Sequence, residues 1–214
     1  MPTVESYKIM TKRRNLYLRV SKGHFATNHS HINYYIDVTT QKTRLSEAQA
    51  VAEELVGYYG SSTIVDSILC LDGTQVIGTC LANELTKGNF VSINAHQTIY
   101  VLTPEHTAGS QLIFREGLLS AIKGKHVLIL AASVTTGYTA QSAVEAIRYY
   151  GGEVAGIAAL FATVDECSGY TVRSIFDPND LKDYESHPSH QCPMCREGKK
   201  IDALVNSFGY SKLH

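Results

Sequence analysis

The chain has 214 residues, 44% of them hydrophobic, which is enough to bury a sizeable core in one domain. Its 19 lysines and arginines nearly balance its 20 aspartates and glutamates, so the formal net charge is -1. This balance argues against a dedicated binder of nucleic acid or of an anionic membrane. No apolar run approaches the ~20 residues that cross a bilayer. The N-terminus lacks the basic-then-apolar order of a secretory signal, so we expect a cytoplasmic protein.

Helical and strand patterns alternate through the first half of the chain. Ser46 and Gln49 have the spacing of a capping box, which predicts a helix from Ser46 to about Tyr59. A buried strand is expected over residues 64–71, a turn at 72–74, and a helix that runs to about residue 85. Two more strands are predicted at 90–94 and 98–102, followed by a loop over 103–111.

The second half of the chain continues this alternation. It predicts a helix at 113–122, a strand at 127–130, an amphipathic helix that ends at residues 151 and 152, and a strand at 153–161. A polar stretch rich in Pro, His and Cys follows at 177–200, before a last element at 201–208. Together these patterns predict an α/β fold with a mostly parallel sheet flanked by helices. Ligands bind such sheets at the carboxyl ends of the strands, where the turns at Asp72 and Ser133 would both lie.

The turn after the strand at 127–130 has the layout of an anion site. Its members are Ser133, Val134, Thr135, Thr136, Gly137, Tyr138 and Thr139. Backbone N–H groups at a helix N-terminus point outward, the helix dipole favours negative charge, and hydroxyls add donors, so a phosphate would fit there. The same composition is also typical of a simple helix cap, because Ser and Thr are preferred N-caps.

This turn resembles the 5-phosphoribosyl-1-diphosphate (PRPP) loop of the type I phosphoribosyltransferases. Residues 135–139 match the T-T-G-x-T part that cradles the ribose 5-phosphate in that family. Ala131 and Ala132 stand where the family has an acidic pair. The resemblance implies the type I phosphoribosyltransferase fold, which has a small hood region beside the central sheet.

Two further stretches resemble the orotate phosphoribosyltransferases of this group. Residues 25–37, which include Tyr34 and Tyr35, resemble the family's segment that forms part of the hood over the base. An ordinary strand is the alternative for that stretch. Residues 66–78 lie where the family has its pyrophosphate loop, so Asp72, Gly73 and Thr74 would offer close backbone approach and a hydroxyl. A helix cap with a turn is the alternative here.

The resemblance also predicts how the chain is organised. We expect a single domain over residues 1–214, with a hood or N-terminal segment at 1–45, a core at 60–165 and a C-terminal appendage at 177–214. The family usually dimerises, so a homodimer is implied. PRPP or a nucleotide, together with a nucleobase, would be the small-molecule partners, with neither nucleic acid nor a membrane among them.

Five cysteines are present, an odd number. Cys70, Cys80 and Cys167 stand singly in apolar or turn contexts, which favours buried thiols in a reducing compartment. The remaining pair, Cys192 and Cys195, belongs to a Cys-Pro-x-Cys-x-x-Gly sequence that resembles a tail found in some orotate phosphoribosyltransferases.

His187 and His190 lie just before this pair of cysteines. The four side chains would supply soft or borderline ligands within nine residues, which suits one tetrahedral Zn²⁺. The spacing between the His pair and the Cys pair is very short for a zinc finger. Free thiols, or ligands from a second subunit, are therefore the alternatives.

The chain departs from the family's pattern at two places that matter for catalysis. In the family, the acidic pair binds the ribose hydroxyls, and the loss of two charge-assisted hydrogen bonds would weaken ribose recognition by ~3–6 kcal/mol. The family's basic loop corresponds here to residues 103–111, which contain His106 but no Lys or Arg. Arg115 would substitute only if this loop is longer than it looks. Mg²⁺ carried by PRPP could supply part of the missing positive charge.

Three functions remain open from the sequence. The first is a phosphoribosyltransferase that acts on a nucleobase, of the pyrimidine or orotate type, with altered ribose contacts. The second is a non-catalytic nucleotide or PRPP sensor that keeps the phosphate cradle. The third is a different chemistry on the same scaffold, such as hydrolysis of a nucleotide or sugar phosphate.

Overall fold

The computed structural model describes residues 6–10, 16–87, 92–95, 97–107, 111–206 and 209–213. These residues form two compact units. Gln41–Ile175 make up the core unit, and the terminal unit combines the described residues up to Thr40 with those from Phe176 onward. The segments that we expected as hood and as C-terminal appendage therefore contribute to the same unit.

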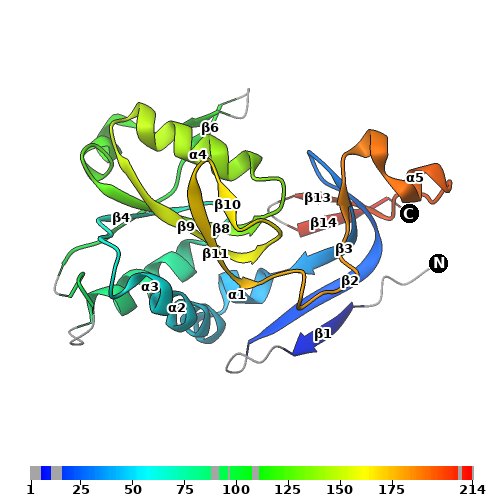
Figure 1. The fold of residues 1–214 in the computed structure, drawn as a ribbon, viewed down its shortest axis with the longest axis horizontal. Coiled ribbons are helices and arrows are strands. Elements are labelled where there is room, and N and C mark those ends of the chain that lie inside the picture. The colour runs from blue at the N-terminus through cyan, green and yellow to red at the C-terminus, as the bar shows by residue number, and fades with distance from the viewer. Residues whose placement is uncertain are drawn as a thin grey trace. The chain divides into compact units, whose positions relative to one another are not determined.

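The core unit is built around a six-stranded, mostly parallel sheet (Figure 1). Its strands, in spatial order, are β10 (Glu166–Cys167), β11 (Tyr170–Phe176), β9 (Glu153–Ala162), β8 (His126–Val134), β4 (Ser67–Cys70) and β5 (Tyr100–Leu102). The pairs β4–β5, β4–β8 and β8–β9 are parallel, and β10–β11 form an antiparallel hairpin at one edge. The α/β fold class with a mostly parallel sheet, predicted from the alternating patterns, is confirmed.

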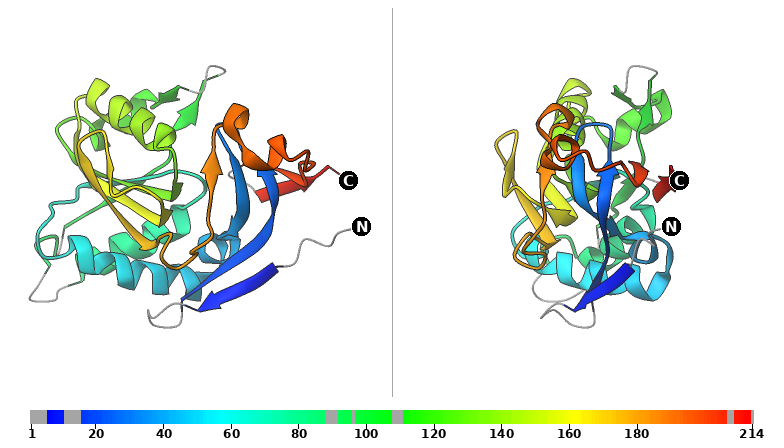
Figure 2. Two further views of the ribbon diagram at one scale, coloured as in Figure 1. Left: turned by 45° about the vertical axis from the view of Figure 1, so that its right-hand side comes forward. Right: turned by 90° about the vertical axis from the view of Figure 1, so that its right-hand side faces the viewer.

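Helices cover both faces of this sheet (Figures 1 and 2). Helix α4 (Tyr138–Tyr149) packs on one face, where Leu69 and Ile129 join its buried residues in one hydrophobic cluster. Helices α2 (Leu45–Tyr59) and α3 (Gln75–Thr86) pack together on the other face. Because side chains alternate along a strand, Ile68 and Cys70 point to the second face and lie against α3. The short helix α1 (Thr39–Thr43) precedes α2.

The terminal unit contains a second six-stranded sheet that the sequence patterns did not predict. Its strands are β1 (Ser6–Met10), β2 (Tyr17–Ala26), β3 (His31–Asp37), β12 (Ser186–His187), β13 (Ala203–Asn206) and β14 (Gly209–Lys212). β2 pairs with β1 and β3 in antiparallel fashion and with β13 in parallel, so the chain's two terminal segments share one sheet (Figure 2). A 3-10 turn, η2 (Ser189–Gln191), and the one-turn helix α5 (Pro193–Arg196) lie between β12 and β13.

Four local predictions were wrong. Helix α2 begins at Leu45 with Arg44 as N-cap and no side-chain cap bond, so Ser46 does not form a capping box. Residues 93–95 form a turn held by the bond from Ile93 N–H to Gly60 O, and the first two residues of the expected strand at 90–94 lie outside the described residues.

The other two errors concern residues 103–122. Within the expected loop, β6 (Glu105–His106) pairs with β7 (Leu112–Ile113) in a small hairpin, and residues 108–110 lie outside the described part. The expected helix at 113–122 is instead β7 followed by the 3-10 helix η1 (Glu116–Ala121). Gly117 weakens an α-helix at this point, and two-residue strands are too short to leave a periodic pattern.

The last expected element, at 201–208, contains strand β13, while residues 207 and 208 lie outside the described residues. None of the described helices is both long enough and apolar enough to cross a membrane.

Candidate phosphate-binding site

Two turns meet at the carboxyl edge of the core sheet. β4 and β8 are parallel neighbours, with Cys70 opposite Leu130. The ladder continues past β4, because the N–H of Leu71 donates to the carbonyl of Leu130 at 2.8 Å. The turn that follows β4 therefore lies beside the last part of β8, the strand that leads into the loop before α4. Hereafter residues 133–139 are called the phosphate loop and residues 72–74 the Asp72 turn.

The phosphate loop is an open strand-to-helix connection. Gly137 has a φ of 78° and forms the N-cap of α4, a backbone conformation that side chains with a Cβ rarely adopt. The first helical bond runs from Gln141 N–H to Gly137 O at 2.8 Å. The N–H groups of the first helical turn precede this bond and point out of the helix end, which is the arrangement that binds anions.

The side chains of the phosphate loop divide between the core and the solvent. Val134 is buried, and the carbonyl of Thr135 accepts a hydrogen bond from Thr163 Oγ1 at 2.9 Å, which fixes the loop against the end of β9. Ser133, Thr136 and Thr139 are exposed. The backbone of the loop is thus held by Thr163, while the hydroxyls of the loop remain available to a ligand.

The Asp72 turn has a left-handed backbone at two consecutive residues. Asp72 has a φ of 54° and Gly73 a φ of 79°. A positive φ is uncommon at a residue with a side chain, and such local strain often occurs at functional sites. Thr74 differs from expectation, because its hydroxyl is fully buried and bonds to the carbonyls of Leu71 and Leu130 at 2.8 and 3.0 Å. Thr74 therefore holds the turn on the sheet.

The Asp72 carboxylate lies against Ala132, near the end of β8. Burial raises the pKa of this carboxyl group. Its charged form is favoured by Lys42, by the Ala132 N–H, which donates to it, and by His106. Lys42 also donates from Nζ to the Asp72 carbonyl at 2.8 Å. The site thus contains one carboxylate, one ammonium group and one imidazole close together.

Lys42 is a site residue that the sequence reasoning missed. It lies in α1, 30 residues before Asp72, in a Thr-Thr-Gln-Lys-Thr segment that has no recognisable motif. A Cβ added at Gly73 would lie 3.8 Å from the Lys42 ammonium group. A glycine at that position therefore keeps the space beside the ammonium group open.

Ala131 and Ala132 lie near the end of β8, beside the site, and provide no carboxylate. Ala131 is 2% exposed and belongs to the hydrophobic cluster under α4, and Ala132 is 8% exposed. The hairpin of β6 and β7 adds one imidazole, His106, which is exposed. Arg115 is engaged in a two-pronged ion pair with Glu105, at 2.9 and 2.5 Å, so its guanidinium braces this hairpin.

Comparisons with known proteins show which proteins the chain resembles. The orotate phosphoribosyltransferase of Chlorobaculum parvum is 26% identical over 185 residues, which cover 85% of this chain and 86% of the relative. The crystal structure of orotate phosphoribosyltransferase from Mycobacterium tuberculosis, in complex with Fe(III) dicitrate, matches with a TM-score of 0.54 and 19% identity, over 77% of this chain and 92% of that chain. The chain is therefore similar in sequence to orotate phosphoribosyltransferases and has the fold of the type I phosphoribosyltransferases.

A phosphoribosyltransferase that acts on a different base by its name shares the fold. The crystal structure of adenine phosphoribosyltransferase from Thermoanaerobacter pseudethanolicus has a TM-score of 0.51 at 16% identity, and the match covers 67% of this chain and 88% of that chain. No protein-family model matches the chain. The likeness to type I phosphoribosyltransferases therefore rests on the sequence relatives and on the shared fold.

The hood residues predicted from this family likeness are packed within the terminal unit. Tyr34 is 4% exposed and meets Tyr7 edge-on at 6.5 Å. Tyr35 is 7% exposed and packs against Phe25 and Tyr210, with ring centroids 6.0 and 4.9 Å away. Both lie in β3, so the expectation of an ordinary strand holds for this stretch. A role toward a nucleobase stays a prediction.

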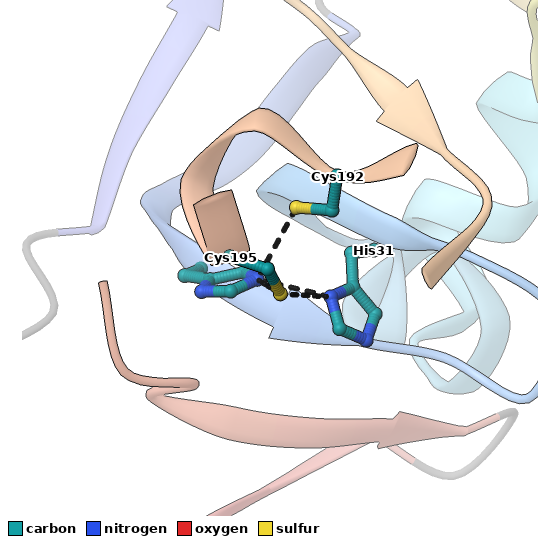
Figure 3. A group of neighbouring side chains, drawn as sticks. His31, Cys192 and Cys195 are labelled. Carbon is teal, nitrogen blue, oxygen red and sulfur yellow. Dashed lines mark hydrogen bonds between the residues drawn. The ribbon is translucent and has the colours of Figure 1, made fainter. Parts of the chain in front are cut away.

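The two thiols of the Cys-Pro-x-Cys-x-x-Gly sequence lie near histidines other than the two that the sequence predicted as ligands. Cys192 and Cys195 lie with His24 and His31, whose ligand atoms are all within 4.8 Å of the thiols and of one another (Figure 3). His187 and His190 are not part of this group. His187 pairs with Glu185 at 3.2 Å, and His190 with the Gln191 amide at 3.1 Å. Sequence spacing favoured the nearest histidines, whereas the β-sheet supplies two that are more than 160 residues away.

Proposed function

We propose that this chain binds PRPP at the carboxyl edge of the core sheet and transfers its 5-phosphoribosyl group to a nucleobase of the pyrimidine type, such as orotate. One observation carries the proposal: the Asp72 turn lies against Leu130 and Ala132 of β8, the strand that leads into the open phosphate loop. The phosphate loop would bind the 5-phosphate through helix N–H groups and hydroxyls. The Asp72 turn would face the pyrophosphate.

Lys42 supports a role for the Asp72 turn in binding pyrophosphate. Its Nζ lies 2.8 Å from the Asp72 carbonyl, beside the exposed backbone of Gly73. Pyrophosphate leaves with developing negative charge, which fixed cations stabilise. Residues 103–111 carry no Lys or Arg, so Lys42 would supply the positive charge that the family's basic loop provides elsewhere.

Asp72 also supports the proposal, because it places a carboxylate next to the two positions where this chain has alanine and the family has an acidic pair. Its side chain accepts the N–H of Ala132, one of the two positions where the family has an acid. Mg²⁺ is usually held by one or two carboxylates together with substrate phosphates, so the site fits a Mg²⁺ ion that PRPP brings with it. Such an ion would neutralise part of the pyrophosphate charge. Asp72 would be its protein ligand.

Binding and turnover can be measured separately. Calorimetry with PRPP and Mg²⁺ tests the site, and release of pyrophosphate with orotate, uracil or adenine tests transfer and the choice of base. We expect binding of PRPP and base-dependent release with a pyrimidine. An absence of turnover across the base panel would refute transfer, and an absence of PRPP binding would refute the site.

A negative charge placed in the phosphate loop tests whether PRPP binds there, and the same charge placed elsewhere provides the control. Thr136→Asp should abolish PRPP binding, because the new carboxylate repels the phosphate. Ser61→Asp adds the same charge at an exposed turn before the amino end of β4, and it should bind PRPP as the wild type does. Undiminished binding by Thr136→Asp would mean that the ligand lies elsewhere.

A PRPP or nucleotide sensor is the second candidate, and Ala131 with Ala132 favours it. Two buried alanines provide no carboxylate for the ribose hydroxyls, and Ala131 is committed to the core. A sensor would bind PRPP without releasing pyrophosphate from it. Pyrophosphate release that does not depend on a base would instead indicate hydrolysis, the third function that the sequence left open.

A further inference from the structure

The terminal unit contains a group of imidazoles and thiols for which the proposed transferase reaction has no use. We call it the His/Cys cluster, and its members are His24, His31, Cys192 and Cys195. Figure 3 shows His31, Cys192 and Cys195 turned toward one another. His24 and Cys192 are buried, His31 is half-buried and Cys195 is exposed, so the cluster lies at the edge of the unit.

The spacing of the ligand atoms matches the edges of a coordination tetrahedron. Zn–S bonds of about 2.3 Å and Zn–N bonds of about 2.0–2.1 Å, at tetrahedral angles, separate neighbouring ligand atoms by about 3.3–3.8 Å. His24 Nε2 lies 3.1 Å from His31 Nδ1, 3.5 Å from Cys192 Sγ and 3.7 Å from Cys195 Sγ. Cys195 Sγ lies 3.2 Å from His31 Nδ1. These four separations lie within a few tenths of an ångström of the values expected around a single ion, and the other two lie within 4.8 Å.

The surroundings of His24 fix the ring in the orientation that a metal requires. Its other ring nitrogen, Nδ1, lies 3.0 Å from the carbonyl of Lys199 and 3.2 Å from that of Lys200. A carbonyl accepts only from N–H, so Nδ1 carries the proton and the lone pair of Nε2 points into the cluster. An imidazole that donates its second nitrogen to a backbone carbonyl is the usual support for a metal ligand.

The two cysteines occupy a tight turn that brings both thiols to the same side. Cys192 precedes α5 and Cys195 lies within it, with Arg196 N–H donating to Cys192 O at 3.2 Å. Gly198 then adopts a φ of 73° and donates its N–H to Cys195 O at 3.1 Å. The glycine of the Cys-Pro-x-Cys-x-x-Gly sequence therefore reverses the chain shortly after the second thiol.

We propose that the His/Cys cluster binds one zinc ion as a closed structural site. Two thiolates and two imidazoles are a typical ligand set for zinc, and four protein ligands leave no open position for a substrate. The thiolates also balance the two charges of the ion. The ion would join the β2–β3 hairpin to the segment around α5, whose ligands are separated by more than 160 residues of sequence. Zinc would thus hold the two terminal segments of the chain together.

Metal analysis of the full chain tests this site directly. Protein dialysed against a weak chelator should retain one equivalent of zinc, measured by mass spectrometry of the metal. Replacement with cobalt should give the intense thiolate charge-transfer bands and the tetrahedral d–d bands of a two-sulfur site. Dialysed wild-type protein without stoichiometric zinc, or a cobalt spectrum without thiolate bands, would overturn the proposal.

Substitutions of the two less buried ligands separate this cluster from the histidines nearer in sequence. His31→Ala and Cys195→Ser should lower zinc retention at least ~10-fold, since even a lost supporting contact usually costs 10–100-fold in metal affinity. His190→Ala and Cys167→Ser remove an imidazole and a thiol outside the cluster, and both should keep the full equivalent. Loss of zinc in His190→Ala, with retention in His31→Ala, would overturn the ligand set.

A measurement on the wild type covers the case in which these variants fail to fold. Removal of the metal with a strong chelator should lower the melting temperature, and added zinc should restore it. The same cycle should operate in His190→Ala. A melting temperature that does not respond to chelator or to zinc would contradict a structural site. None of these readouts depends on transferase activity.

Discussion

Lys42 shows how a single side chain can change the electrostatics of a site. It is the lysine whose ammonium group touches the Asp72 turn, and the phosphate loop beside that turn carries no charged side chain. A charge-assisted hydrogen bond contributes about 1.5–3 kcal/mol. We therefore expect Lys42→Met to weaken PRPP binding by about 10–100-fold in calorimetry.

A second lysine provides the control for Lys42. Lys123 is exposed in the turn before β8, at the amino end of the strand, opposite the site. Lys123→Met removes the same charge from the molecule and should leave PRPP binding unchanged. Equal losses in both variants would point to the net charge of the protein, and equal retention would exclude Lys42 from the site.

At the scale of elements, α3 depends on a glycine for its contact with the sheet. Gly78 lies in α3 against β4, and a Cβ at this position would overlap the sulfur of Cys70 and lie 3.4 Å from Val101. Both Cys70 and the helix face are buried, so the chain has little room to relax. Gly78→Ala should lower the free energy of unfolding by about 1–3 kcal/mol, measured by chemical denaturation.

Two variants distinguish this overlap from a general effect of replacing glycine in a helix. Gly57 is exposed in α2 with open space around it, so Gly57→Ala should raise the stability by about 0.5–1 kcal/mol. The double variant Gly78→Ala with Cys70→Ala should recover part of the loss, since the overlapping sulfur is gone. Additive effects in that double-mutant cycle would contradict the proposed contact.

The elements that sequence reasoning predicted well are those with long, local patterns. The strands β8 and β9 and the amphipathic helix α4 each leave a continuous apolar or 3.6-residue pattern, and the expected phosphate loop lies between β8 and α4. The second sheet was missed because its pairing is non-local. β13 joins β2 in a register that pairs Ala203 with Phe25, which no local pattern records.

Site residues were likewise predictable only where a local sequence pattern marks them. The Asp72 turn and the phosphate loop each come directly after a strand, so their meeting could be predicted from parallel pairing alone. Lys42, His24 and His31 reach their partners through tertiary packing. Their participation depends on which strands and helices are neighbours, and that information is distributed over the whole chain.

At the scale of the whole molecule, the two units differ in the interactions that stabilise them. The core unit has a large hydrophobic cluster between its sheet and α4, which includes Leu69, Ile129 and Val144. Among the described residues of the terminal unit, one hydrophobic cluster has only four buried members, Phe25, Ile32, Tyr35 and Ala203, and Leu18 and Val20 are buried outside it. Small cores often rely on disulfides or metals for stability. A zinc ion in the terminal unit would meet that need.

Asp66 contributes to the pH dependence of the core unit's stability. Asp66 lies at the amino ends of three strands, where its carboxylate accepts the His126 N–H at 2.8 Å and contacts the His126 ring at 2.9 Å, and its carbonyl accepts the Tyr100 N–H at 3.0 Å. Burial alone would raise the pKa of Asp66, but the backbone and ring of His126, together with Lys125, hold it below its ordinary value. The folded state therefore favours the ionised carboxylate.

This shift sets the sign of a testable change in stability. A carboxyl group with a lowered pKa in the folded state stabilises the fold above its unfolded pKa of about 4, and this contribution is lost as the pH falls through the folded value. Asp66→Ala should thus cost about 1–2 kcal/mol at pH 7, because the carboxylate is partly exposed, and the difference from wild type should shrink below pH ~4. Asp66→Asn keeps an acceptor for the His126 N–H and should cost less at pH 7. Urea denaturation between pH 3 and 8 measures both variants, and a loss in Asp66→Ala that stays constant over this range would show that Asp66 acts through packing rather than charge.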